Sequence, residues 1–410
     1  MTDNVTDPET SAVFSSTASA RRRPTGHHDR STMPPGQAPK TRSRTIDLVA
    51  TVILASALLM APAPARAAPV DEARADAEWI LQAQLPDGAI ANQLDQRVIW
   101  PYLGNFAAVG LARAAQLAAD PRYADAAWRW LGWYQAHQDA SGFVSDYTVS
   151  GGVLASTGDM DSTDAYAGTF LIAVNAAWQA TGDLARLREL EPGIVAAVAA
   201  IKATQRSDGL TWAKPSAHVK YLMDQAEAFA GLRVAAVLAG VLSNAELEAR
   251  ASAAARRVRA GVRRLWNPRL DAYDWAVHAN GRRQRTNWRV LYPDALQQTW
   301  AVAFGLVRGE RARALMRRFT REQPRWDRPA SIARFRRPHG AGLAPVGYWA
   351  PAAWAFARVG DERRSQLAAR RLRRAAVASG RAWPFTTADA GQLVVLAEPA
   401  RDGLSRLLGP

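Results

Sequence analysis

The segment "IKATQRSDG" (Ile201–Gly209) has a form that recurs along the chain and decides the fold. A helical run ends in a polar residue, and a short turn with an aspartate and usually a glycine follows. Repetition of one such unit is typical of helical hairpins stacked side by side. The same form is found in "LQAQLPDG", "WYQAHQDASG" and "VRRLWNPRLDAYDW", which end at Gly88, Gly142 and Trp275.

The turn aspartates of these four segments set the repeat length. They are Asp87, Asp139, Asp208 and Asp271, and they lie 52, 69 and 63 residues apart, so two helices fit in each interval. Further breaks at 323–346 and 380–385 leave room for about twelve helices after Asp71. Six hairpins can close into a toroid, and we therefore predict an all-α protein with an (α/α)6 barrel.

Local signals agree with helices, and no alternating strand pattern competes. Asp120-Pro121 is typical of a helix start, with the aspartate as the N-cap and proline in the first turn. "SNAEL" (Ser243–Leu247) predicts a capping box between Ser243 and Glu246.

The N-terminal part has a different composition. Residues 1–45 contain few large apolar side chains, and we expect them to be disordered. An apolar run (Ile46–Met60) and the small-residue site at Ala65–Ala67 predict a signal peptide over residues 46–67. Cleavage near Ala67 would export a barrel domain of residues 68–410 to the periplasm or the medium; an uncleaved anchor is the alternative. Met33 is a second possible start.

The formal net charge of +15 and the lack of cysteine limit the function classes. Without cysteine the chain has no lipoprotein site and no disulfide framework. Arginine clusters late in the chain favour either solvated helix faces or an association with acidic polymers of the envelope. Export and the lack of a nucleic-acid-binding motif argue against a nucleic-acid partner. We expect a monomer.

Three aspartates fall within six positions of "GDMDSTDAYAGTF" (Gly158–Phe170), directly before a helical run. A phosphatase would need this motif after an apolar strand, which is missing. A calcium loop would need glycine at its sixth position and glutamate at its twelfth, where Asp164 and Phe170 stand. A terpene cyclase would need an adjacent aspartate pair. One aspartate can cap the helix, but capping does not explain three.

Four stretches resemble the six-hairpin glycosidases: "DMDSTDAYAGTFL", "KYLMDQAEAFAGL", "YPDALQQTWAVAFGL" and "GYWAPAAWAFARVGD". The first is also loosely similar to the aspartate-rich segment of family 8 glycoside hydrolases. This resemblance implies a glycoside hydrolase of an oligosaccharide or polysaccharide, with inversion at the anomeric carbon.

Two carboxyl groups across the scissile bond are needed for this chemistry. Asp224 and Glu227 share one face of an apolar helical segment, and an apolar setting raises a carboxyl pKa toward the range of a general acid. We therefore predict Glu227 as the acid. We predict Asp164 as the first choice for the base, with Asp161 as a further catalytic residue and Asp87 as an alternative partner.

Aromatic side chains at junctions between loops and helices are candidates for stacking against sugar rings. The chain has no evident cofactor motif or metal-ligand spacing, so we expect neither. Two alternatives stay open: a polysaccharide lyase that uses His218 or His278 on an acidic polymer, and a non-catalytic carbohydrate-binding protein. The predicted substrate-binding residues are Asp87, Trp100, Tyr102, Asp159, Tyr166, Trp212, Asp224, Trp288, Tyr348 and Trp349.

Overall fold

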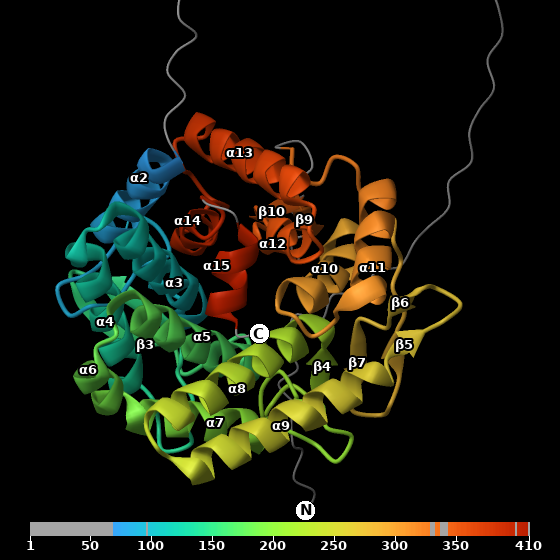
Figure 1. Ribbon diagram of the computed structural model, residues 1–410, viewed down its shortest axis with the longest axis horizontal. Coiled ribbons are helices and arrows are strands. Elements are labelled where there is room, and N and C mark those ends of the chain that lie inside the picture. The colour runs from blue at the N-terminus through green and yellow to red at the C-terminus, as the bar shows by residue number, and fades with distance from the viewer. Residues whose placement is uncertain (1–68, 96, 329–332, 337–342, 398–399, 409–410) are drawn as a thin grey trace, which may run out of the picture. The chain divides into compact units, whose positions relative to one another are not determined.

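Helices dominate the computed structural model, which describes residues 69–95, 97–328, 333–336, 343–397 and 400–408 (Figure 1). These residues all fall within one compact unit. The predicted disordered segment 1–45 and the predicted signal peptide 46–67 lie outside the described residues. Within the described ranges, no helix has both the length and the apolar character needed to cross a membrane.

Two sets of helices alternate along the chain. The members of the first set are buried nearly all round. They are α3 (Pro101–Ala118), α5 (Thr163–Thr181), α8 (Leu222–Val241), α10 (Leu296–Ala303), α12 (Pro351–Arg358) and α14 (Thr387–Val394).

The second set lies outside the first, which Figure 1 shows most clearly for α9, α11 and α13. These helices keep a polar face in solvent. Arginine fills much of that face. The members are α2 (Pro69–Gln82), α4 (Pro121–Ala136), α6 (Leu184–Glu189), α7 (Glu191–Thr204), α9 (Ala245–Arg263), α11 (Gly309–Glu322) and α13 (Glu362–Ala378). The last helix, α15 (Ala400–Leu407), belongs to neither set, because it lies inside the ring of helices in Figure 1 and contacts α12 and α5.

Each buried helix packs against the next one. α3 contacts α5, α5 contacts α8, α8 contacts α10, and α10 contacts α12. The indole of Trp354 on α12 donates a hydrogen bond to the Gln392 carbonyl of α14, and α14 packs against α3. The rings of Phe106, Phe304 and Trp354 lie about 6 Å from one another and fill the space between these helices.

The prediction of an all-helical chain needs one correction, because four small sheets lie in the loops. Each strand has only two to five residues, which is too short for an alternating pattern to be visible in the sequence. All pairings are antiparallel. The strands are β1 (Val98–Ile99), β2 (Tyr147–Ser150), β3 (Val153–Ser156), β4 (Val219–Tyr221), β5 (Trp266–Asn267), β6 (Ala272–Tyr273), β7 (Ala276–His278), β8 (Arg283–Gln284), β9 (Ala333–Arg336) and β10 (Leu343–Gly347).

Two predicted helix starts have different outcomes. Asp120 is the N-cap of α4 and accepts a hydrogen bond from the Arg122 amide, with Pro121 at the first position, as predicted. The capping box at Ser243 is wrong, because Asn244 is the N-cap of α9 and accepts from the Leu247 amide. Ser243 instead takes a left-handed backbone conformation (φ 60°) in the turn.

Candidate active site

The candidate site lies where α5 and α8 begin. Two glycines let these helices approach closely: a Cβ added to Gly231 would lie 2.4 Å from the Gly168 carbonyl oxygen, closer than any side chain allows. The short strand β4 leads directly into α8, and the Leu222 amide bonds to the Trp275 carbonyl. This packing brings the predicted residues Asp164, Asp224 and Glu227 into one cluster.

Glu227 is buried, with 1% of its surface exposed. Its Oε1 accepts a hydrogen bond from the Tyr102 hydroxyl at 2.7 Å and another from the Trp300 indole at 3.0 Å. Its Oε2 is buried without a partner. Burial raises the pKa of Glu227 to about 8, so the carboxyl is protonated at neutral pH and Oε2 is the oxygen free to carry the proton.

Asp164 has a different environment, because donors fill both of its oxygens. Oδ1 accepts from the Ser162 hydroxyl at 2.7 Å and from the Ala165 amide at 2.9 Å, and Oδ2 accepts from the Thr211 hydroxyl. The residue is completely buried, and burial raises its pKa to about 7. Asp164 therefore fixes the start of α5 to the loop that contains Thr211.

Ser162 joins two carboxyl groups. Its Oγ lies 2.7 Å from Asp164 Oδ1 and 3.0 Å from Asp224 Oδ2, but one hydroxyl has only one proton to donate. The second contact is a hydrogen bond only if Asp224 supplies the proton. Burial raises the pKa of Asp224, and the charges of Asp164, Glu227 and Asp161 raise it further, so a protonated Asp224 fits this geometry.

Asp161 lies one residue before Ser162, just ahead of α5. The residue has an exposed surface, yet the protein atoms around its carboxylate bury that group in part and raise its pKa. Burial is the main cause of the raised pKa values of Asp224, Glu227 and Tyr292, and the charge of Asp161 contributes to each. The carboxylate of Asp161 is therefore close enough to these three groups for its charge to act on them.

Three polar contacts hold the loop before α5. Lys214 Nζ donates to Asp159 Oδ1 at 2.6 Å and to the Met160 carbonyl at 2.7 Å. The Tyr166 hydroxyl donates to Asp146 Oδ1 at 2.8 Å. Burial raises the pKa of Asp146 to about 7, and the charges of Asp161 and Asp159 add to the effect.

Aromatic rings surround the carboxyl cluster. Stacked pairs of rings present flat apolar faces of the kind that sugars contact. Trp349 also packs edge-on against Trp300, which binds Glu227. The pairs are Tyr102 with Tyr166, Tyr221 with Trp275, and Tyr292 with Trp349.

The structure thus brings together eight predicted site residues, namely Tyr102, Asp159, Asp161, Asp164, Tyr166, Asp224, Glu227 and Trp349. Trp100 lies next to them at the start of α3, edge-on to the exposed ring of Trp383.

Four predicted residues lie elsewhere. Asp87 accepts a hydrogen bond from the Ala89 amide within its own turn. The ring of Trp212 is stacked between His218 and Arg206. Trp288 and Tyr348 are buried in the core.

Several site residues were not predicted from the sequence. Trp300 and Thr211 reach the carboxyl groups from α10 and from a loop, and both lie far along the chain from the acids that they contact. Asp146 is an isolated aspartate before β2. Among these residues, Ser162 could have been singled out from the sequence, because it stands beside aspartates at a helix start. Its hydroxyl contacts Asp164 and Asp224, however, and does not cap the helix.

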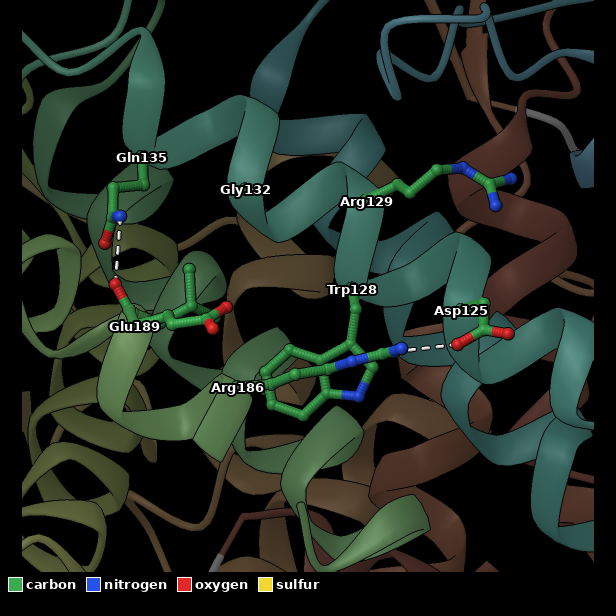
Figure 2. A pocket seen from close by; sticks show the side chains of 8 residues that line it. Asp125, Trp128, Arg129, Gly132, Gln135, Arg186 and Glu189 are labelled. Atoms are coloured by element: carbon green, nitrogen blue, oxygen red, sulfur yellow. Dashed lines mark hydrogen bonds and ion pairs between the residues drawn. The ribbon is translucent and has the colours of Figure 1, made fainter. Parts of the chain in front are cut away.

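Another hollow lies on the outer helices, away from the carboxyl cluster. Figure 2 shows this cavity of about 500 Å³ between α4 and α6. An ion pair between Arg186 and Asp125 crosses it at 2.7 Å, beside the ring of Trp128. The residues that line this cavity come from α4, α6 and Leu190, whereas Glu227 lies on α8 and Asp161 precedes α5. Over the described ranges, no group of three or more potential ligands could hold a metal ion.

No protein family model and no curated protein sequence matches the chain. Solved structures do match. A glycosidase variant in complex with glucose has a TM-score of 0.58 and 16% identity, over 82% of this chain and 97% of its own. A rhamnosidase from Klebsiella oxytoca with rhamnose bound has a TM-score of 0.56 and 15% identity, over 82% of this chain and 65% of its own. A GH78 family rhamnosidase of Bacillus sp. GL1 has a TM-score of 0.55 and 13% identity, over 80% and 34%.

At these identities the likeness shows the fold alone. The chain shares a largely helical fold with solved glycosidases.

Proposed function

We propose that the protein is a glycoside hydrolase in which Glu227 is the general acid. The observation that carries this proposal is the pair of donors on Glu227 Oε1 together with the unpartnered, buried Oε2. The two donors fix the carboxyl group, and a pKa of about 8 keeps its proton in place at neutral pH. A fixed, protonated carboxyl is what a leaving glycosidic oxygen needs.

We assign the general base to Asp161. Asp164, the first choice predicted for this role, is completely buried with donors on both oxygens, so it has no free oxygen for a water molecule. Asp87, the predicted alternative, lies in its own turn away from the site. Asp161 is exposed, and its charge acts on Glu227. A base of this kind activates water on the face opposite the acid and inverts the anomeric carbon.

The helix packing supports the same proposal. Five buried helices contact one another in turn from α3 to α12, and the sixth, α14, contacts both α12 and α3. We propose that they and their outer partners form an (α/α)6 barrel of the six-hairpin type. The glycosidase and the two rhamnosidases that share the fold support an oligosaccharide or polysaccharide as substrate. Export and a monomeric state remain part of the proposal.

The charge of the site favours hydrolysis over lyase chemistry. A lyase must bind the carboxylates of its polymer, usually through cations. In the described part of the site, Lys214 is the cation among the aspartates, and Asp159 already pairs with it. His218 stacks on Trp212 and His278 contacts Arg282, so both histidines have other neighbours.

The test is reducing-sugar release by the full chain from a panel of neutral and acidic glycans. We expect release from at least one neutral glycan. Glu227→Gln and Asp161→Asn should each lower the rate by about 100-fold or more, the usual contribution of acid and base groups. The exposed Glu248→Gln and Asp95→Asn are matched controls that should keep wild-type rates.

Circular dichroism should show that all four variants fold. Unsaturated products with absorbance near 235 nm, as expected for lyase chemistry, would contradict hydrolysis. Equal rates for wild type and Glu227→Gln would remove Glu227 from the mechanism.

A further inference from the structure

Two arginines converge at the ends of α10 and α12 that lie away from the carboxyl cluster. Arg308 follows α10, and Arg358 is the last residue of α12. A Cβ added to Gly305 would lie 2.5 Å from Arg358 Nη2 and 3.2 Å from Arg308 Nη2. Both guanidinium groups therefore share the small space over Gly305. The Arg358 Nη2 is buried and has no hydrogen-bond partner.

Two adjoining cavities open beside this pair. One, of about 420 Å³, is lined by Arg308, Arg313 and Arg358 together with Ser405. The other, of about 270 Å³, shares Val307 and Arg308 with the first. No carboxylate lines either cavity within the described part of the chain, and the second cavity also contains Arg259, Arg263 and Arg311.

The arginines repel one another. Burial is the main cause that lowers the pKa of Arg358 to about 10, and the charges of Arg308 and Arg233 lower it further. Carbonyl groups at helix ends attract cations, and Arg308 Nε does bond to the Gly305 carbonyl. That attraction explains one arginine here. It does not account for Arg358, whose buried Nη2 lies beside the positive charge of Arg308.

We propose that these two neighbouring cavities form a second binding site, distinct from the carboxyl cluster, for a small anion that carries phosphate groups. Guanidinium groups match phosphate oxygens in geometry, and charge-assisted bonds of this kind are among the strongest in proteins. The combined space suits a ligand with more than one anionic group.

The start of α11 adds to the site. Its first residue, Gly309, lines the larger cavity, and no side chain caps the helix there. The free amide groups of a helix start attract anions. The nearby carboxylate of Glu310 is exposed and pairs with Arg313 at 2.9 Å and Arg317 at 2.6 Å, so Arg313 is already paired and the proposed site depends on Arg308 and Arg358.

The test is binding of pyrophosphate to the full chain, by calorimetry and by thermal unfolding at constant ionic strength. Pyrophosphate should bind and raise the unfolding temperature, whereas chloride should not. Arg358→Gln and Arg308→Gln should each weaken binding about tenfold or more, since one charge-assisted bond is lost. The exposed Arg256→Gln on α9 lines neither cavity and should bind pyrophosphate like wild type.

A second readout separates binding from a structural role. In chloride, Arg358→Gln should unfold at or above the wild-type temperature, because it removes a charge that its neighbours repel. A lower unfolding temperature with an unchanged pyrophosphate response would overturn the proposal. An equal response to citrate would overturn the assignment of phosphate. If Arg358→Gln does not fold, undiminished binding by Arg308→Gln decides against the site.

Discussion

At the scale of single residues, the site depends on how few donors serve many carboxyl groups. Tyr102 and Trp300 hold one oxygen of Glu227, and the single hydroxyl of Ser162 serves both Asp164 and Asp224. Buried carboxyl groups with so few partners retain protons, because ionisation would leave unpaired charge in the core. The surroundings of Glu227 therefore raise its pKa and make it suited to the role of a general acid.

Loss of this proton has a measurable cost in stability. A carboxyl with a raised pKa favours folding when protonated and opposes it when ionised. Glu227→Gln cannot ionise, so at pH 8.5 it should raise the free energy of unfolding by roughly 1–3 kcal/mol while activity is lost. Urea unfolding measures this change. Glu248→Gln on the surface should have no such effect, and a loss of stability in Glu227→Gln would show that the charged form is the favoured one.

The Ser162 bridge gives another test at this scale. Ser162→Ala removes the shared hydroxyl and leaves two buried carboxyl groups short of a partner, so stability should fall by about 1–3 kcal/mol. Ser162→Thr keeps a hydroxyl and should recover most of the loss. Unfolding in urea at pH 6 compares the two variants. Equal stability of wild type and Ser162→Ala would show that the bridge contributes nothing.

At the scale of elements, the approach of α5 and α8 decides where the carboxyl groups meet. Gly168 and Gly231 permit that approach, and Asp164 and Glu227 each lie four residues before one of them. A side chain at either glycine would push the helices apart. It would also separate Ser162 from Asp224.

Gly231→Ala should therefore destabilise the protein by about 1–3 kcal/mol, the usual effect of overpacking a tight contact. Gly132→Ala on α4 is the matched control. Its Cβ would meet no atom within 4 Å, and alanine favours helix, so stability should stay equal or rise slightly. Thermal unfolding of both variants makes the comparison. A Gly231→Ala protein as stable as Gly132→Ala would mean that the two helices can move apart freely.

The sequence predicts the long helices well and the short elements poorly. Asp120-Pro121 marks its helix start because a side-chain acceptor and a fixed backbone act in one place. Ser243 and Asn244 are both good caps, and only the turn geometry decides between them. The two-residue strands leave no pattern to find.

For the candidate site, local sequence reveals the acids but not their partners. Asp164 and Glu227 stand out as charges within apolar segments. Trp300 and Thr211 belong to segments far away along the chain and meet Glu227 and Asp164 only through packing, and Asp146 meets the Tyr166 hydroxyl in the same way. No spacing in the sequence encodes such contacts.

At the scale of the whole molecule, acids and arginines gather at different ends of the same helices. Glu227 lies near the start of α8 and Trp349 just before α12, whereas Arg358 ends α12. The acidic end holds protons and the basic end holds positive charge over Gly305. Stability should therefore respond to pH mainly through the acidic end.

The native protein should take up protons as pH falls from about 8. The pKa of Glu227 is raised to about 8, and those of Asp164 and Asp146 to about 7, above their values in an unfolded chain. The folded state thus binds more protons, so the free energy of unfolding should rise between pH 8.5 and pH 6. Urea unfolding across this range measures the slope. A stability that falls on acidification over this range would show that the buried carboxyl groups are ionised.

The most direct measurement is an infrared titration of the Glu227 carboxyl group in the full chain, with Glu227→Gln as the reference spectrum. We predict a protonated carboxyl band at pH 6 that is missing from the variant and disappears with a midpoint near pH 8. A midpoint near the ordinary glutamate value of about 4.3 would contradict the assignment of Glu227 as the general acid.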